Sequence, residues 1–233
     1  MKRAGAARLR ELAVQYGLDE LQLTSLERVL AVLAADPTAS TTVRDPERAV
    51  DIHVADSLCG LVVPALREAR LIADLGAGAG FPAAVLAIAL PDARVVAVES
   101  VTRKCKWIRI LAAEVQISNL EVACERAESW SSGREACDVV TARAVAPLGV
   151  LCEYAAPLLR VGGTLVAWKG VVDDEELRGS ERAAERLGFS PLPDIPVAPF
   201  PGSRDHRLSC FVKKDPTPAG FPRRPGMATK RPL

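Results

Sequence analysis

The chain has 233 residues, of which 49% are hydrophobic and 25% charged, and its formal net charge is +1. This composition is typical of one globular domain, with or without a small helical extension, and it excludes a disordered or collagen-like protein. The longest uncharged stretch, residues 75–91, is broken by glycines and prolines, so it cannot span a membrane, and we expect a soluble protein that is not secreted.

The first 70 residues predict a helical region. Apolar residues recur at helical spacing over 9–16 and again over 23–33. After a polar loop, Asp45 has the features of an N-cap and Pro46 those of a first helical residue. The helix that they begin is expected to end or kink at Pro64.

Short apolar runs and amphipathic stretches alternate from Leu71 onwards. The apolar runs predict strands over residues 71–75, 94–99, 119–124, 137–145, 163–170 and 208–214. Helical patterns stand between or after them, over 82–90, 107–115, 147–160 and 173–187. Strands separated by helices predict a doubly wound α/β fold, with a mostly parallel sheet covered on both faces. The last run has no helix after it and is expected to join the sheet antiparallel.

The two ends of the chain are basic. Residues 1–10 contain Lys2 and three arginines with no acid, and the basic residues from Lys213 onwards are opposed only by Asp215, so the remainder is acidic. Basic ends suit a protein that binds a polyanion, although they also serve simple solubility. We divide the chain into three parts: a helical cap (1–70), a Rossmann-like domain (71–214) and a basic, proline-rich tail (215–233).

The six cysteines are spread along the chain, with no two closer than 13 positions, so the C-x-x-C pair of a metal site does not occur. Only His53 and His206 could add imidazole ligands. We therefore predict no metal site and no disulfide, and interpret the cysteines as buried thiols in a reducing cytoplasm.

A glycine-rich turn follows the first predicted strand, in the sequence LIADLGAGAGF of residues 71–81. Gly76, Gly78 and Gly80 allow the backbone to turn tightly and to approach a ligand before the next helix begins. The second predicted strand ends at Glu99, where an acid can accept hydrogen bonds from both hydroxyls of a ribose. This succession of elements predicts a nucleoside site.

Two kinds of nucleoside cofactor share this layout. The G-x-G-x-x-G pattern of NAD-dependent oxidoreductases requires a third glycine at the position of Phe81. Asp74, just before the turn, also suits a cation better than a pyrophosphate, which prefers uncompensated helix amides. We therefore favour the sulfonium S-adenosylmethionine and keep an NAD-dependent Rossmann oxidoreductase as the alternative.

Several short motifs, in order along nearly the whole chain, resemble those of a known family. They are HVADSL at 53–58, DLGAGAGFP, Glu99-Ser100, Arg126-Ala127-Glu128, TARAVAPL, WKG and the terminal FPRRPG…KRPL. The family is that of the bacterial small-subunit ribosomal RNA guanine-N7 methyltransferases called RsmG or GidB. The chain departs from its usual pattern at Ala83, where a glycine is common, and at His206-Arg207-Leu208, where Arg-His-Leu is common, so we assign neither His206 nor Arg207 a catalytic role.

This resemblance implies a class I S-adenosylmethionine-dependent methyltransferase fold with an amino-terminal helical extension. It implies methyl transfer from S-adenosylmethionine to N7 of a guanine in 16S rRNA, presented as RNA, as the 30S subunit or as an assembly intermediate. We expect a cytoplasmic monomer that binds neither DNA nor a membrane. A non-catalytic ribosome-assembly factor that binds RNA is the second alternative.

The resemblance also implies which residues hold the cofactor. Glu99 and Ser100 would meet the ribose, Ala127 and Glu128 would lie beside the adenine, and Arg143 would complete the pocket. Phe81 would contact the adenosine or the target base, with a hydrophobic plug as the alternative. The expected cofactor site therefore comprises Gly76, Gly78, Phe81, Glu99, Ser100, Ala127, Glu128 and Arg143.

Contacts to RNA are expected from cationic residues near this site and in the tail. They are Arg103, Lys104, Lys169, Arg223, Arg224, Lys230 and Arg231. The tail cations are expected to dock on rRNA phosphates, away from the cofactor residues, with packing of the tail over the pocket as the alternative. A solvated helix face is the alternative for Arg103 and Lys104, and a structural ion pair is the alternative for Lys169 and for Arg143.

Guanine N7 carries an in-plane lone pair and no proton, so its methylation is a direct displacement that needs no strong base. We therefore predict no catalytic acid or base, and expect the rate to depend on holding the two reactants in line. Because side chains hardly enter the deep major groove of A-form RNA, the target base must be unpaired or flipped out.

Overall fold

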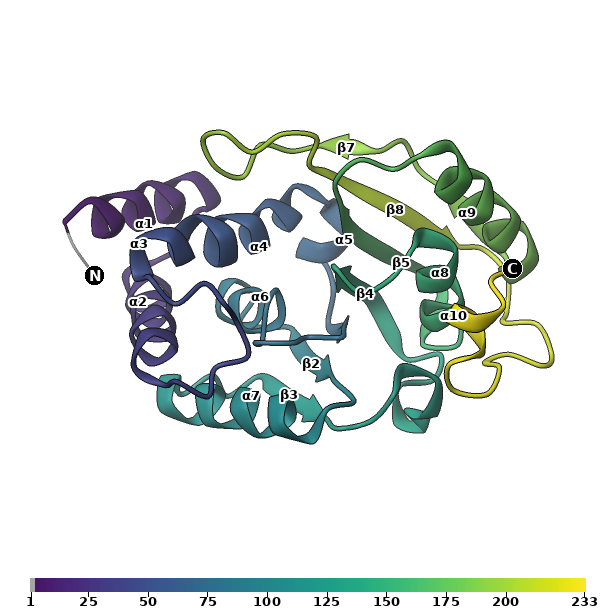
Figure 1. Ribbon diagram of the computed structural model, residues 1–233, viewed down its shortest axis with the longest axis horizontal. Coiled ribbons are helices and arrows are strands. Elements are labelled where there is room, and N and C mark those ends of the chain that lie inside the picture. The colour runs from purple at the N-terminus through teal and green to yellow at the C-terminus, as the bar shows by residue number, and fades with distance from the viewer. Residues whose placement is uncertain (1–2) are drawn as a thin grey trace.

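The structure, a computed structural model, describes residues 3–233 (Figure 1). Lys2, part of the basic amino-terminal stretch, lies outside the described residues. Of the helices in the described part, none is long and apolar enough to cross a membrane. Nor do residues 3–233 contain a cluster of three or more histidine, cysteine or acidic side chains that could hold a metal ion.

The centre of the molecule is one sheet with the strand order β3-β2-β1-β4-β5-β8-β6, and β7 pairs with β8. The strands are β1 (Leu71–Leu75), β2 (Arg94–Val98), β3 (Leu120–Ala123), β4 (Cys137–Arg143), β5 (Leu159–Lys169), β6 (Phe189–Pro191), β7 (Ile195–Pro196) and β8 (Arg207–Lys213). Strands β1 to β5 pair in parallel, whereas β8 joins β5 antiparallel. The predicted α/β fold with a mostly parallel sheet is confirmed.

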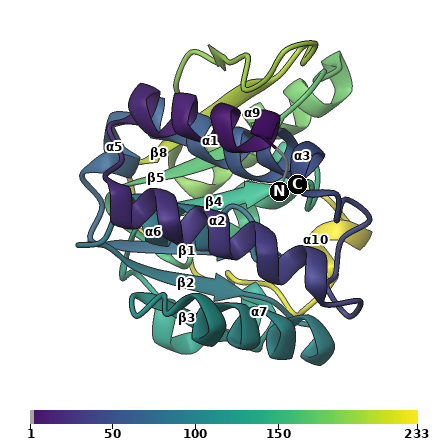
Figure 2. The ribbon, with the colours of Figure 1, turned by 90° about the vertical axis from the view of Figure 1, so that its left-hand side faces the viewer.

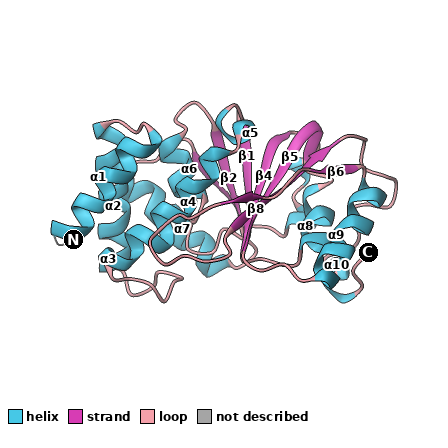
Figure 3. Ribbon diagram, turned by 90° about the horizontal axis from the view of Figure 1, so that it is seen from above, coloured by secondary structure: helices cyan, strands magenta, loops and turns pink. Residues whose placement is uncertain are grey.

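Helices cover both faces of this sheet (Figure 3). On one face lie α6 (Ala83–Ala89) and α7 (Thr102–Val115), and on the other α8 (Leu148–Ala155) and α9 (Asp174–Leu187). Successive residues of a strand point to opposite faces, so Ile72 belongs to one hydrophobic core and its neighbour Ala73 to the other. Burial on both faces explains why β1 and β2 are mostly apolar, apart from Asp74 and Arg94.

The amino-terminal helices extend the first of these cores (Figure 2). They are α1 (Arg3–Tyr16), α2 (Glu20–Ala35), a continuous helical run made of α3 (Pro46–Ala49), the π-helical η1 (Val50–Ala55), α4 (Asp56–Leu58) and the 3₁₀-helical η2 (Cys59–Val62), and α5 (Pro64–Arg67). Asp19 and Gln22 form a capping box at the start of α2. Gln22 also donates to the carbonyl of Ile88 at 2.9 Å, which fixes α2 against α6.

Asp45 caps the run that Pro46 opens, as the sequence predicts. The run ends at Val62, just before Pro64, as expected, and Pro64 begins the separate short helix α5, because proline fits the first turn of a helix.

The tail folds back onto the sheet domain as extended chain and one short helix, α10 (Met227–Lys230) (Figure 1). Ala228 of α10 is buried, and the Thr229 hydroxyl lies 3.1 Å from the Tyr154 hydroxyl of α8. The short strands β6 and β7, in the region of the proline-rich stretch, are not predicted by the sequence pattern. They pair with β8 through only a few residues.

Candidate functional site

The carboxyl ends of β1, β2, β4 and β5 meet at one edge of the sheet, where ligands of open α/β sheets bind. Because β8 runs antiparallel, its first residue, Arg207, pairs with the last residue of β5, Lys169, at the same edge. Two pockets open along this edge, and both are lined by Val145, Ala146 and Pro147, which follow β4.

The glycine turn after β1 requires glycine at its first position. Gly76 has a φ of +64°, in the left-handed region, and a Cβ there would lie 2.8 Å from Cγ2 of Val145. Trp107 of α7 donates its indole N–H to the carbonyl of Ala79 at 3.0 Å, which anchors the far side of the turn. The turn therefore lies close against the residues that line both pockets.

Asp74 does not face the ligand site, contrary to the expectation that it meets a cation. Its carboxylate is buried and accepts hydrogen bonds from the Thr141 hydroxyl at 2.8 Å and from the Ala83 N–H at 3.3 Å. Burial raises the pKa of Asp74 to about 7. Its role in the structure is to connect β1, β4 and the start of α6.

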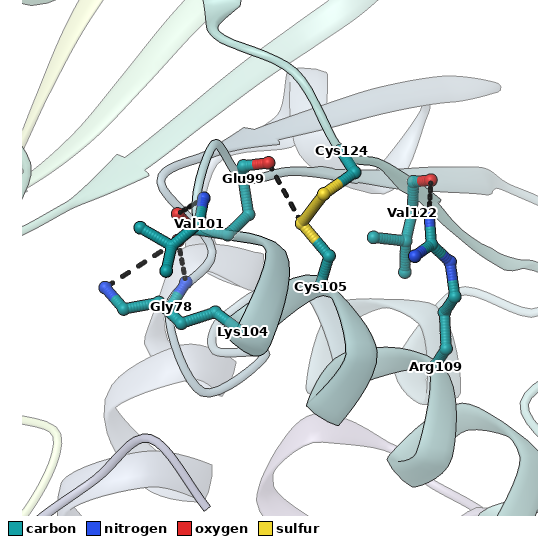
Figure 4. Close-up of a disulfide and its surroundings, with 8 residues drawn as sticks. All are labelled: Gly78, Glu99, Val101, Lys104, Cys105, Arg109, Val122 and Cys124. Atoms are coloured by element: carbon teal, nitrogen blue, oxygen red, sulfur yellow. Dashed lines mark hydrogen bonds and ion pairs between the residues drawn. A yellow bond between two sulfur atoms is a disulfide. The ribbon is translucent and has the colours of Figure 1, made fainter.

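Glu99, directly after β2, orders the edge of the turn (Figure 4). One carboxylate oxygen accepts the Gly78 N–H at 3.1 Å and the other the Val101 N–H at 2.9 Å, while Lys104 Nζ lies 3.9 Å away. The side chain is about 5% exposed. Each oxygen of a carboxylate has two acceptor sites, so Glu99 retains capacity for two ribose hydroxyls.

The first pocket, with a volume of about 220 Å³, lies beside Glu99 and is here called the nucleoside pocket. It brings together five of the residues predicted for the cofactor site, namely Gly76, Glu99, Ser100, Ala127 and Glu128. The 3₁₀-helical turn η3 (Ala127–Ser129) supplies the last two. Gly78 is not among the residues that line the pocket, but its backbone N–H holds the Glu99 carboxylate through a hydrogen bond.

The acids of the nucleoside pocket outnumber its bases. Glu99, Glu125 and Glu128 line it together with Arg126. An acidic lining attracts a sulfonium cation and repels a pyrophosphate. The charge of these residues therefore suits S-adenosylmethionine better than the diphosphate of a nicotinamide dinucleotide.

The tail borders the nucleoside pocket, which agrees with the alternative expectation and not with the favoured one that places it away from the cofactor residues. Thr229 and Tyr154 line the pocket, and Glu128 accepts the backbone N–H of Gly226 at 2.8 Å. Neither Tyr154 nor Thr229 was predicted from the sequence, because only the packing of α10 on α8 brings them together.

The second pocket, of about 530 Å³, is here called the outer pocket. Arg143 lines this pocket and not the nucleoside pocket, because its guanidinium turns towards the helical cap. There Arg143 donates to the Asp56 carboxylate at 2.5 Å and to the carbonyl of Ile52 at 3.2 Å. Lys169, also in the lining, pairs with Glu176 of α9 at 2.6 Å. Both cations thus make the ion pairs considered as alternatives to ligand contacts.

Phe81 fills space beneath the glycine turn. Its side chain is buried and stacks on the imidazole of His53, with ring centroids 4.4 Å apart and planes within 6° of parallel. Burial and the nearby Arg143 lower the pKa of His53 to about 4, so the ring is neutral at physiological pH. This position corresponds to the hydrophobic plug, and Phe81 is not among the residues that line either pocket.

The cations predicted to contact RNA differ in their surroundings. Arg103 on α7 and Arg224, Lys230 and Arg231 in the tail are exposed. Arg223 instead forms a two-point ion pair with Glu153 of α8, whose side chain is only 2% exposed. The Arg223 guanidinium thereby holds the tail against the body of the protein.

Cys105 and Cys124 are joined by a disulfide, so the prediction that every cysteine is a thiol is wrong (Figure 4). The first turn of α7 and the end of β3 approach at the carboxyl edge of the sheet, where the two Cα atoms are 5.8 Å apart. A separation of 19 residues in sequence gave no indication of this contact. The remaining cysteines, Cys59, Cys137, Cys152 and Cys210, are buried thiols.

Comparison with known proteins agrees with this architecture. Residues 25–193 match the family described as rRNA small subunit methyltransferase G. A ribosomal RNA small subunit methyltransferase G of Rubrobacter xylanophilus is 40% identical over 219 residues, which cover 91% of this chain and 84% of the relative. The protein of that name from Deinococcus radiodurans is 41% identical over 239 residues, covering 99% and 93%.

Solved structures with low sequence identity share the fold. Aeropyrum pernix fibrillarin with bound S-adenosyl-L-methionine matches with a TM-score of 0.52 and 19% identity, covering 68% of this chain and 73% of that protein. The 16S rRNA (adenine(1408)-N(1))-methyltransferase of Catenulisporales acidiphilia matches with a TM-score of 0.54 and 18% identity, covering 66% and 90%. The chain thus has the fold of class I S-adenosylmethionine-dependent methyltransferases.

Proposed function

Because the chain belongs to the rRNA small subunit methyltransferase G family, we propose that it transfers the methyl group of S-adenosylmethionine to N7 of a guanine in 16S rRNA. The observation that carries this proposal is the pair of pockets that share the lining residues Val145, Ala146 and Pro147. A methyl donor in the nucleoside pocket and a base in the outer pocket would meet there.

The residues of the nucleoside pocket suit the donor. Glu99 and Ser100 would bind the ribose, and the turn at Ala127 and Glu128 would border the adenine. Gly76, whose missing Cβ lets the turn approach Val145 of the shared wall, would lie beside the sulfonium end. The acidic lining supports this assignment over the NAD-dependent oxidoreductase alternative.

The reaction requires no proton transfer from the enzyme. The N7 lone pair forms the new bond to the methyl carbon, the carbon–sulfur bond breaks with its electrons remaining on sulfur, and the positive charge passes to the base. Catalysis by this chain then consists of holding the base and the methyl group in line. Because N7 is inaccessible in a duplex, the base would enter the outer pocket unpaired or flipped out.

RNA phosphates would be contacted by the exposed cations Arg103, Arg224, Lys230 and Arg231. Lys104, Lys169 and Arg223, which already face acids, would contribute through the local charge rather than as unpaired contacts.

The division into a cap (1–70), a methyltransferase domain (71–214) and a tail (215–233) remains our interpretation, supported by the change from helices to strands at Leu71. We further propose a cytoplasmic monomer acting on 16S rRNA, on the 30S subunit or on an assembly intermediate.

Transfer of radiolabelled methyl groups tests the proposal. The protein is incubated with labelled S-adenosylmethionine and with 30S particles or naked 16S rRNA that lack the modification, and the labelled base is then identified. We expect 7-methylguanine at one position. Particles that bind the protein but accept no label would instead support the non-catalytic assembly factor.

Calorimetry with S-adenosylmethionine and with NADH tests the choice of cofactor. We expect binding of the first and not of the second. Binding of NADH alone would contradict the proposal and support the oxidoreductase alternative.

A further inference from the structure

The outer pocket contains a carboxylate that the proposed chemistry does not use. Asp56, from the helical cap, lines this pocket together with Arg143 of β4, and their side chains are 14% and 18% exposed. Oδ2 of Asp56 accepts from Arg143, whereas no group among residues 3–233 donates to Oδ1. Asp56 therefore offers the outer pocket a carboxylate oxygen that can accept hydrogen bonds from a ligand.

The surrounding residues hold Asp56 in place. The Trp168 indole N–H donates to the backbone carbonyl of Asp56 at 2.7 Å, and Trp168 itself lines the pocket. Arg143 is fixed in turn by the carbonyl of Ile52, at 3.2 Å. The pocket thus presents an acceptor and a donor at a defined spacing beside an aromatic ring, which is how enzymes bind a base removed from its stack.

The arrangement of donors and acceptors distinguishes guanine from adenine. The Watson–Crick edge of guanine offers two donors, N1–H and the N2 amino group, beside the acceptor O6. Adenine offers the acceptor N1 and the donor N6 at the corresponding edge. A carboxylate next to a guanidinium is complementary to guanine, because the carboxylate accepts from both donors and the guanidinium donates to O6.

We infer that Asp56 is the residue that selects guanine, accepting hydrogen bonds from N1–H and the N2 amino group of the target base in the outer pocket. Arg143 donates to O6 of the same base through N–H groups that Asp56 and Ile52 leave unused. N7, on the other side of O6, then faces the wall shared with the nucleoside pocket. This inference rests on the proposed function, and it names the residue that recognises the target base.

The test combines a protein variant with a base analogue. Inosine is guanosine without the N2 amino group, so it removes one of the two hydrogen bonds to Asp56. We expect the wild-type kcat/KM for methylation to fall about ten- to hundredfold when the target guanosine is replaced by inosine. In Asp56→Asn the ratio of kcat/KM on guanosine to kcat/KM on inosine should shrink to less than about threefold. The activity of this variant on guanosine should itself be low. Any intrinsic difference between the two bases cancels in the comparison of the two ratios.

Two controls separate recognition from structure. Asp51→Asn breaks a comparable arginine pair, Arg8–Asp51 at 3.1 Å, on the same helical run but outside the pocket, and should retain the wild-type ratio. Arg143→Lys should lower activity on both bases while retaining the ratio, because O6 is present in both. The affinity for S-adenosylmethionine, measured by calorimetry, should be unchanged in Asp56→Asn.

A guanosine-to-inosine ratio in Asp56→Asn equal to that of the wild type would overturn the inference. A wild-type enzyme that methylates inosine as fast as guanosine would also overturn it. This second outcome can be measured even if the variant does not fold. Wild-type protein that labels no rRNA at all would instead refute the proposed function, and with it this inference.

Discussion

Glu99 accepts a hydrogen bond from the backbone of Gly78 at 3.1 Å, so the acid that ends β2 and the glycine turn that follows β1 form one unit. An acid placed to bind a ribose therefore also fixes the loop that approaches the rest of the nucleoside. Loss of its charge should weaken ligand binding both directly and by loosening the turn.

Glu99→Gln should lower the affinity for S-adenosylmethionine by roughly ten- to hundredfold, because hydrogen bonds to a charged acceptor are replaced by weaker ones. Calorimetry measures the change. Glu121→Gln is the matched control, since Glu121 is exposed and pairs with Arg94 away from both pockets. Equal affinities in the two variants would show that Glu99 does not bind the donor.

Arg223→Ala should destabilise the protein, because it leaves the buried carboxylate of Glu153 without its partner. We expect a loss of about 2–4 kcal/mol in the free energy of unfolding, reduced from the value for a fully buried pair because Arg223 is partly exposed. Arg224→Ala, its exposed neighbour, should change stability by less than about 0.5 kcal/mol. Denaturant unfolding compares the two, and equal stabilities would argue against a structural role for the Arg223–Glu153 pair.

Replacing Arg224, Lys230 and Arg231 together by alanine should weaken RNA binding without affecting the donor. Each lost phosphate contact reduces the slope of log affinity against log salt by roughly 0.7–0.9. Filter binding of 16S rRNA over a range of salt concentrations measures the slope, and calorimetry checks that the affinity for S-adenosylmethionine is retained. An unchanged slope would show that these side chains are only solvated.

His53→Gln should change how stability depends on pH. The imidazole takes up a proton near pH 6.5 in the unfolded chain but only near pH 4 in the folded protein, so wild-type protein loses stability as the pH falls through this window. The variant lacks this loss, so its free energy of unfolding relative to that of the wild type should rise by up to about 1.4 kcal/mol for each unit by which the pH falls within this window.

Asp74 contributes the opposite dependence. Its pKa of about 7 in the folded protein lies above the ordinary value, so its contribution to stability is present at low pH and lost as the pH rises from about 4 to 7. The free energy of unfolding of Asp74→Asn should therefore increase relative to that of the wild type as the pH rises through this range. Unfolding by denaturant across this range measures both variants, and parallel curves for wild type and His53→Gln would refute the assignment for His53.

The disulfide should be detectable by counting thiols. Labelling of unreduced, denatured protein should modify Cys59, Cys137, Cys152 and Cys210, and a peptide containing Cys105 linked to Cys124 should appear in the mass spectrum. Reduction should lower the free energy of unfolding by about 2–4 kcal/mol, given the length of the closed loop. Because disulfides are uncommon in reducing compartments, protein alkylated directly in cells gives the more informative count. Labelling of every cysteine would contradict the bond.

The sequence pattern predicts the sheet well where strands are buried on both faces. Residues 71–75 were predicted as a strand and form β1, because an apolar run next to a glycine turn has few other solutions. The short strands β6 and β7 were missed, since proline-rich segments of two or three residues pair only through tertiary contact.

The candidate site was predictable where its residues follow strands or belong to one of the motifs noted in the sequence. Gly76 and Glu99 were found in this way, and both line the nucleoside pocket. Thr229 was not, because no local pattern indicates that α10 packs beside α8. Asp56 lies within a motif that was noted, but its position opposite Arg143 depends on how the cap docks on the sheet.

Val145 belongs to the wall that the two pockets share and lies against the position where Gly76 has no Cβ. A single compound that joins adenosine to guanine by a short linker could therefore pass over Val145 and occupy both pockets at once. Such a bisubstrate ligand would lose translational and rotational freedom once instead of twice, so it should bind more tightly than either half. The side chain at position 145 would then set the shortest linker that the protein accepts.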